Sequence, residues 1–149
     1  MQRRSVLLAI PALLLGTPLI AHAAAPLVEV YKSASCGCCT DWVRHLQDNG
    51  FAVKAQDVAN PSDYREKFRM PEELGSCHTA RVGGYTLEGH VPAREIRRLL
   101  AERPRAVGLA VPAMPMGSPG MEGHRSDPYD VLLVGTDGRY TVYRHYAGK

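Results

Sequence analysis

Three of the four cysteines in the chain lie within four consecutive residues, Cys36-Gly37-Cys38-Cys39. Cys36 and Cys39 have the C-x-x-C spacing of a thiol–disulfide pair, and an apolar helical pattern begins directly after them. The N-terminus of a helix stabilises thiolate through its dipole and its free backbone N–H groups. The spacing therefore predicts a cluster of sulfurs with thiolate chemistry.

Such a cluster could bind a metal, carry out dithiol redox chemistry or form structural disulfides. A simple redox site needs two sulfurs, which leaves Cys38 unused. Three thiols this close together converge readily on a metal; Cu(I) prefers thiolate and tolerates low coordination, whereas Zn(II) prefers four ligands in a tetrahedron. An even number of cysteines also allows two structural disulfides. Adjacent Cys38 and Cys39 would need a strained turn to pair with each other. We therefore favour metal binding.

Methionine and histidine supply weaker candidate ligands. Met114, Met116 and Met121 lie in a segment rich in Pro and Gly, where thioether sulfur is a soft ligand. Packing of that segment onto the core is the alternative role of these methionines. His78 follows the fourth cysteine, Cys77, and is a candidate ligand or hydrogen-bond donor to a ligand. The remaining histidines after residue 23 are weaker candidates, namely His45, His90, His124 and His145.

The elements that must position these residues follow from the apolar periodicity and the turn residues. We expect strands at 27–33, 51–58, 79–82 and 85–91, and helices after Cys39, after Asn60 and from Pro92 to Pro104. Gly83-Gly84 is a hairpin turn between the last two of these strands. The resulting order is β-α-β-α-β-β-α with the cysteine cluster between the first strand and the first helix. This order is typical of a thioredoxin-like α/β domain.

The C-terminal third extends that domain. Residues 106–111 are apolar, and residues 112–127 form a long loop that is rich in Pro, Gly and Met. Residues 129–135 and 140–146 alternate about Asp137-Gly138, which predicts a C-terminal β-hairpin. A loop of this length is uncommon unless it is functional or tied down. We expect it to fold over the cysteine site.

The expected fold also places Cys77. In a thioredoxin-like domain the segment that enters the third strand packs beside the active-site turn, and redox members usually carry a cis-proline there. This chain has Ser76-Cys77-His78 in that place and no proline. We therefore expect the sulfur of Cys77 to face the other three. Bridging thiolates could hold several Cu(I) ions as a cluster.

The N-terminal segment and the net charge indicate the location of the protein and its possible partners. Residues 1–23 have a basic start, an apolar stretch and a final Ala-His-Ala, the order of a secretory signal peptide. The mature protein, residues 24–149, is then a single domain that is exported from the cytoplasm. The formal net charge of the whole chain is +3, and Arg3 and Arg4 supply two of these charges. The nearly neutral mature chain gives no electrostatic case for nucleic acid or a membrane surface as a partner.

Four stretches form a specific combination over most of the mature chain. They are Cys-Gly-Cys-Cys at 36–39, Ser-Cys-His-Thr at 76–79, Gly-Tyr-Thr-Leu-Glu-Gly-His-Val-Pro at 84–92 and Met-Pro-Met-Gly-Ser-Pro-Gly-Met-Glu at 114–122. With these motifs the chain resembles the CopG-like copper-resistance proteins, an exported thioredoxin-like family also called domain of unknown function 411. The resemblance implies a periplasmic copper-binding protein whose metal sits on the cysteines.

Individual residues of this chain match functional positions of the family motifs. It implies a ligand role for four residues, which are Cys36, Cys38, Cys39 and Cys77. Met114 and Met121 match motif methionines, whereas Met116 occupies a variable position. His78 and His90 also match. The family leaves sequestration, delivery and redox cycling of copper open as cellular activities.

The sequence therefore predicts a periplasmic protein of copper resistance that holds Cu(I) on four cysteine thiolates. His78, Met114 and Met121 are further ligands or neighbours of the ligands. Coupling of Cu(II)/Cu(I) exchange to dithiol oxidation is an additional hypothesis, and other periplasmic copper-handling or redox proteins are the expected partners. The alternative from the enzyme class is a periplasmic thiol-disulfide oxidoreductase that uses the Cys36/Cys39 pair.

Overall fold

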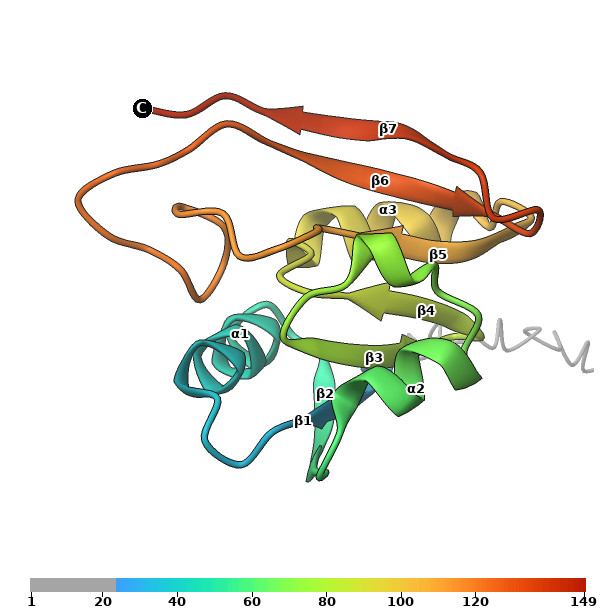
Figure 1. Ribbon diagram of the computed structural model, residues 1–149, viewed down its shortest axis with the longest axis horizontal. Helices are drawn as coiled ribbons and strands as arrows, with labels where there is room; N and C mark the ends of the chain where they lie inside the picture. Colours follow the sequence, from blue (N-terminus) through green and yellow to red (C-terminus); the bar gives the residue numbers. More distant parts are fainter. Residues whose placement is uncertain (1–23) are drawn as a thin grey trace, which may run out of the picture.

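The first strand leads directly into the cysteine segment. The computed structural model describes residues 24–149 (Figure 1), so the predicted signal peptide at 1–23 lies outside the described residues. The elements in chain order are β1 (Leu27–Lys32), α1 (Gly37–Asp48), β2 (Ala52–Asp57), α2 (Pro61–Lys67), the 3-10 turn η1 (Glu72–Leu74), β3 (His78–Val82), β4 (Tyr85–Glu88), α3 (Ala93–Glu102), β5 (Ala106–Ala110), β6 (Tyr129–Gly135) and β7 (Tyr140–Tyr146).

All described strands belong to one mixed sheet. Its seven strands run in the order β2-β1-β3-β4-β5-β6-β7. The β1–β2 and β4–β5 pairs are parallel and the others antiparallel. The predicted element order and the C-terminal hairpin are confirmed. The apolar run at 106–111 is the strand β5, which joins the hairpin to the rest of the sheet; its role depends on a parallel pairing with β4 across α3 that no local pattern reveals.

The helices cover the two faces of the sheet. Val30 of β1 packs in the main core with Trp42 of α1 and Ile96 of α3. Tyr31, the next residue of β1, stacks on Tyr64 of α2 with ring centroids 4.0 Å apart. Because successive strand side chains point to opposite faces, α1 and α3 lie on one face and α2 lies on the other. Figure 1 shows the same arrangement, with α2 in front of the sheet and α3 behind it.

The β3–β4 hairpin fixes a register that matters for the site. Thr79 pairs with Glu88, and Val82 pairs with Tyr85 across the two-glycine turn. The pairing extends beyond the strands, because the N–H of Gly89 donates to the carbonyl of His78 at 3.0 Å. Gly89 takes a φ of +69°, which ends β4 at Glu88 rather than at the predicted residue 91. One step further along this register, Cys77 lies opposite residue 90.

The long loop after β5 returns to the N-terminal turn of α1 (Figure 1). Gly120 makes the closest approach: a Cβ at this position would lie 2.7 Å from the carbonyl oxygen of Cys38 and 2.8 Å from the amide nitrogen of Trp42. The same residue has a φ of +86°. The expectation that the loop folds over the cysteine segment is thus met by a backbone-to-backbone contact that only glycine permits.

The helices of residues 24–149 are too short or too polar to cross a membrane.

Comparison of two glycine substitutions tests the contact between Gly120 and the start of α1. Gly138, in the β6–β7 turn, has a similar φ of +81° but no atom within 4 Å of its would-be Cβ. We expect Gly138→Ala to lower the free energy of unfolding by about 1 kcal/mol, which is the cost of left-handed backbone for alanine. Gly120→Ala carries the same cost and about 1–3 kcal/mol more, because its methyl group meets backbone atoms. Urea unfolding of both variants measures the difference, and equal losses would contradict the proposed close packing.

Candidate metal centre

The cysteine turn is built by the start of α1. Cys36 is the N-cap residue, with extended backbone angles, and no side chain caps the helix. The cysteine sulfurs therefore lie at the positive end of α1, as predicted from the sequence. Cys39 points into the core and is fully buried, whereas Cys36 and Cys38 are half-buried.

The structure brings the fourth cysteine to the other three. The sulfur of Cys38 lies 3.5 Å from that of Cys36 and 4.0 Å from that of Cys77. All four sulfurs lie within 4.8 Å of one another. Cys36 and Cys39 are joined by a disulfide here, and Cys38 and Cys77 carry free thiols. The expectation that Cys77 faces the cysteine turn is therefore confirmed by the geometry.

Burial holds Cys77 as a neutral thiol. Burial, and after it the neighbouring Cys38, raise the pKa of Cys77 to about 12. Its sulfur lies 3.1 Å from Nε2 of His90 and 3.4 Å from Nδ1 of His78. A metal that binds here must displace the thiol proton, which is released to solvent because burial keeps both neighbouring imidazoles neutral.

The tautomer of His90 follows from its other contact. Its Nδ1 lies 2.7 Å from the carbonyl oxygen of Pro119, which only accepts hydrogen bonds, so Nδ1 carries the proton. Nε2 therefore presents a lone pair to Cys77. Burial lowers the pKa of His90, which favours this neutral form. A carbonyl group that orients a neutral imidazole in this way is typical of metal-ligating histidines.

The position of His90 beside Cys77 follows from the β3–β4 hairpin. The signal was present in the sequence: a two-residue turn at Gly83-Gly84 fixes the register of the hairpin, and that register places His90 opposite Cys77. The sequence alone places His90 at the end of a predicted strand, among the weaker candidates. The register places its Nε2 3.1 Å from the sulfur of Cys77, nearer than Nδ1 of His78 at 3.4 Å.

His78 is buried on the far side of Cys77. Its ring lies 4.3 Å from the Trp42 ring, centroid to centroid. Burial, and after it His90, lower the pKa of His78 to about 3. Within residues 24–149, Nε2 of His78 is the buried side-chain nitrogen or oxygen that has no hydrogen-bond partner. The ring nitrogen of His78 that contacts Cys77 is Nδ1, so Nδ1 is the donor atom that this side chain offers to the site.

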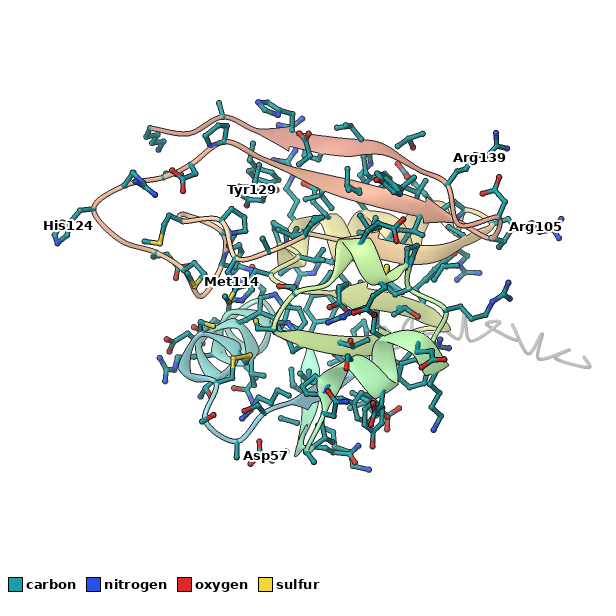
Figure 2. All side chains as sticks on the ribbon, in the orientation of Figure 1. Asp57, Arg105, Met114, His124, Tyr129 and Arg139 are labelled. Atoms are coloured by element: carbon teal, nitrogen blue, oxygen red, sulfur yellow. A yellow bond between two sulfur atoms is a disulfide. The ribbon has the colours of Figure 1, made fainter. Side chains whose placement is uncertain are left out.

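The loop contributes one thioether directly to the site. Met114 is 47% exposed, and its sulfur lies 4.0 Å from that of Cys38. Met121 is half-buried and is tied into the loop by backbone hydrogen bonds with Gly117 and Ser118. Figure 2 shows Met114 near α1 and His124 at the tip of the loop, away from α1.

Two of the weaker histidine candidates have structural partners. Nε2 of His45 accepts a hydrogen bond from the N–H of Ala93 at 3.1 Å, which ties α1 to the start of α3. His145 lies 2.7 Å from the carboxylate of Asp130 on the neighbouring strand. These contacts account for both side chains without a metal.

This set of donors fits a soft ion. The four cysteine sulfurs form one group, and Cys77 forms a second group with the imidazoles of His78 and His90. The thioether of Met114 lies against Cys38, and soft sulfur ligands favour Cu(I) over hard cations. The Cys36–Cys39 disulfide must be reduced before those two sulfurs can bind as thiolates.

The burial of His78 should make the stability of the folded protein depend on pH. The unfolded chain takes up a proton at His78 below about pH 6.5, whereas the folded chain resists this until about pH 3. Stability should therefore fall as the pH is lowered through this window, by up to about 1.4 kcal/mol per pH unit from this residue. We expect His78→Phe to reduce the slope, with urea unfolding of the metal-free protein between pH 7 and 4 as the measurement. His124→Ala, at the exposed loop tip, is the control; a slope unchanged in His78→Phe would refute the assignment.

Comparison with known proteins identifies the family. Residues 74–121 match the family model described as "Protein of unknown function, DUF411". No curated protein matches the chain. Two solved structures, titled "Copper resistance protein copG- Form 2" and "Copper resistance protein copG- Form 1", match it with 44% and 45% identity and a TM-score of 0.78 for each. Each comparison covers 82% of this chain and 98% of the solved chain. The chain therefore belongs to the CopG-like family of copper-resistance proteins, the family also described as DUF411.

Proposed function

We propose that this protein binds Cu(I) in the periplasm through the thiolates of four residues, Cys36, Cys38, Cys39 and Cys77, as part of copper resistance. The observation that carries the proposal is the convergence of four sulfurs within 4.8 Å of one another, from the start of α1 and the start of β3. Copper is the cargo of the site. The titles of the two similar structures name copper resistance, which supports the choice of metal.

The proposal includes secondary ligands. Met114 lies against Cys38, and His90 and His78 lie against Cys77, so each flank of the sulfur group has a further donor. Sulfurs at these separations can each bridge two metal ions, which supports more than one Cu(I) per chain. Met121 belongs to the same loop and stays a candidate ligand.

Redox coupling is the second part of the proposal. Two Cu(II) ions each take one electron from a dithiol, which yields two Cu(I) ions, one disulfide and two protons. Cys36 and Cys39 are the pair that supplies these electrons, because theirs are the sulfurs that are bonded here. After this step Cys38 and Cys77 are the thiols left to bind the two Cu(I) ions, and binding through all four thiolates follows once a dithiol reductant has reduced the Cys36–Cys39 disulfide.

The thioredoxin-like description and the periplasmic location belong to the same proposal. The order β-α-β-α-β-β-α, with a C-x-x-C pair at the start of the first helix, supports the first. The signal-like order of residues 1–23 supports the second.

A protein thiol-disulfide oxidoreductase is the rival function. The Cys36–Cys39 disulfide at a helix N-terminus favours it, since that is the arrangement of dithiol active sites. The extra sulfurs of Cys38 and Cys77, with His90 behind them, have no part in that chemistry. A mixed disulfide between a Cys39→Ser variant and a client protein would support the rival.

Titration of the reduced protein with Cu(I) tests the binding. Under anaerobic conditions and against a competing chromophoric chelator, we expect tight uptake that falls at least about tenfold in Cys77→Ser, because one of four thiolate ligands is lost. His124→Ala is the matched control, since it lies in the same loop but away from the sulfurs (Figure 2). Weak uptake that Cys77→Ser leaves unchanged would remove copper as the ligand.

A stoichiometric assay tests the redox coupling. Cu(II) added to the fully reduced protein should yield two Cu(I) for each Cys36–Cys39 disulfide formed, counted by a Cu(I)-specific chromophore and by mass spectrometry. Cys36→Ser should abolish the disulfide. Metal-free protein isolated from the periplasm with all four thiols free would count against the coupling.

A further inference from the structure

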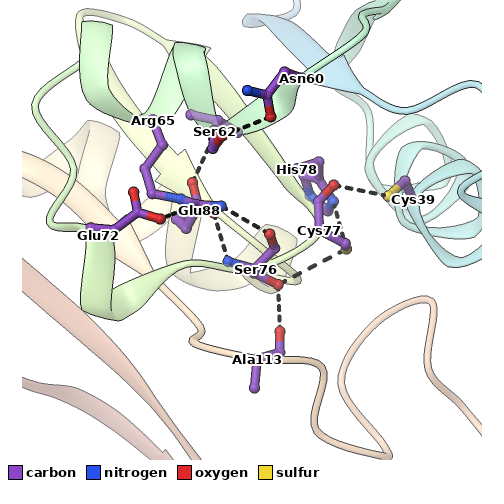
Figure 3. Close-up of polar contacts among 11 residues, drawn as sticks. Cys39, Asn60, Ser62, Arg65, Glu72, Ser76, Cys77, His78, Glu88 and Ala113 are labelled. Carbon is purple, nitrogen blue, oxygen red and sulfur yellow. Dashed lines mark hydrogen bonds and ion pairs between the residues drawn. The ribbon is translucent and has the colours of Figure 1, made fainter.

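The residue before Cys77 is held by two buried side chains. The N–H of Ser76 donates to Oε1 of Glu88 at 2.8 Å, and the carbonyl of Ser76 accepts from Nη2 of Arg65 at 3.1 Å (Figure 3). Both backbone polar groups of one loop residue are thus bound by side chains from other elements. Loop backbone is more often hydrogen-bonded to water.

These two side chains form a buried ion pair. Nε of Arg65 lies 3.0 Å from Oε1 of Glu88, and Glu88 is 0% exposed. Oε2 of Glu88 accepts from the hydroxyl of Thr79 at 2.6 Å, so both carboxylate oxygens are bonded. Burial raises the pKa of Glu88, and these hydrogen bonds oppose the rise. A charge in such a place is retained only when its partners are fixed in position.

Packing leaves the segment no room to move. A Cβ on Gly75 would lie 2.7 Å from Nη1 of Arg65, so the guanidinium rests directly on the backbone. A Cβ on Gly89 would lie 2.6 Å from Oγ of Ser76 and 2.5 Å from the carbonyl of Val111. Ser76 is therefore enclosed between Arg65 on one side and the end of β4 on the other.

The same segment also holds the loop that carries Met114. The N–H of Ala113 donates to the carbonyl of Gly75 at 3.2 Å, and the hydroxyl of Ser76 donates to the carbonyl of Ala113. Ala113 has a φ of +59° and directly precedes Met114. Cys77 thus directly follows Ser76, which the ion pair holds, and Met114 directly follows Ala113, which is hydrogen-bonded to Gly75 and Ser76.

We propose that Arg65 and Glu88 are positioning residues of the copper site: by holding Ser76 they set where Cys77 and Met114 stand relative to Cys38. We call this arrangement, of Arg65 and Glu88 bound to Ser76, the Ser76 clamp. The inference rests on the proposed function, because it assigns to these residues an effect on Cu(I) binding. It explains why an ion pair is buried where apolar residues could fill the space.

Apolar replacement of the pair separates positioning from stability. Exchange of a whole buried ion pair for apolar residues often leaves a domain folded, whereas loss of one partner does not. The test variant is therefore Arg65→Leu/Glu88→Leu. Arg65→Lys is the second variant: it keeps the charge beside Glu88 but loses the fork that reaches Ser76. Glu72→Leu is the matched control, because Glu72 pairs with the same arginine at 2.8 Å but is 76% exposed and does not touch Ser76.

Two measurements are made on each folded variant. Amide hydrogen exchange of the metal-free protein reports the clamp itself: we expect exchange at Ser76 and Ala113 to become about tenfold faster or more without the pair, while core strands stay protected. Competition titration reports its effect: we expect Cu(I) affinity to fall about tenfold or more in both test variants, since small misplacements of a ligand are costly. Glu72→Leu should stay within roughly twofold of the wild type.

The outcomes distinguish the two proposals. A folded test variant that exchanges faster at Ser76 yet binds Cu(I) as tightly as the wild type overturns the positioning role. If the double variant does not fold, Arg65→Lys decides by the same criterion. A wild-type protein that does not bind Cu(I) overturns the proposed function, and the exchange measurement alone then shows whether the pair holds the segment.

Discussion

The register of the β3–β4 hairpin is the constraint on which the site depends. One pairing puts Thr79 opposite Glu88, and its continuation puts Cys77 opposite His90. A slip by one residue would turn every side chain of the hairpin to the other face of the sheet. The two-glycine turn that fixes the register therefore also fixes which groups surround the sulfur of Cys77.

Charge neutrality links the site to the fold around it. Helix α1 offers its positive end to the cysteine turn, and burial keeps both neighbouring histidines uncharged at neutral pH. The imidazoles that face Cys77 therefore add no charge to the site. A metal cation binds thiolates rather than thiols, so each cysteine that binds it releases a proton. The negative charge of the thiolates then balances the positive charge of the metal.

Much of this arrangement could be predicted from the sequence, because its signals are local. The C-x-x-C spacing, the periodicity of α1 and the Asp137-Gly138 turn each lie within a few residues, and their elements were predicted correctly. The buried pair of Arg65 and Glu88 could not be predicted, since its partners lie 23 residues apart on different elements. In the sequence each of them resembles an ordinary surface charge. The same holds for β5, whose role depends on a pairing across α3.

The depth of the sulfur atoms differs in a way that bears on oxidation. Met114 stands half in solvent, the cysteines Cys38 and Cys77 lie below it, and Cys39 is fully enclosed. A thioether cannot form a disulfide, so the outermost sulfur keeps its donor electron pair where an exposed thiol would be capped. Any soft ion that approaches from the exposed side of the loop therefore meets first the sulfur that disulfide exchange cannot block. The sulfurs that can form disulfides therefore lie behind a thioether that cannot.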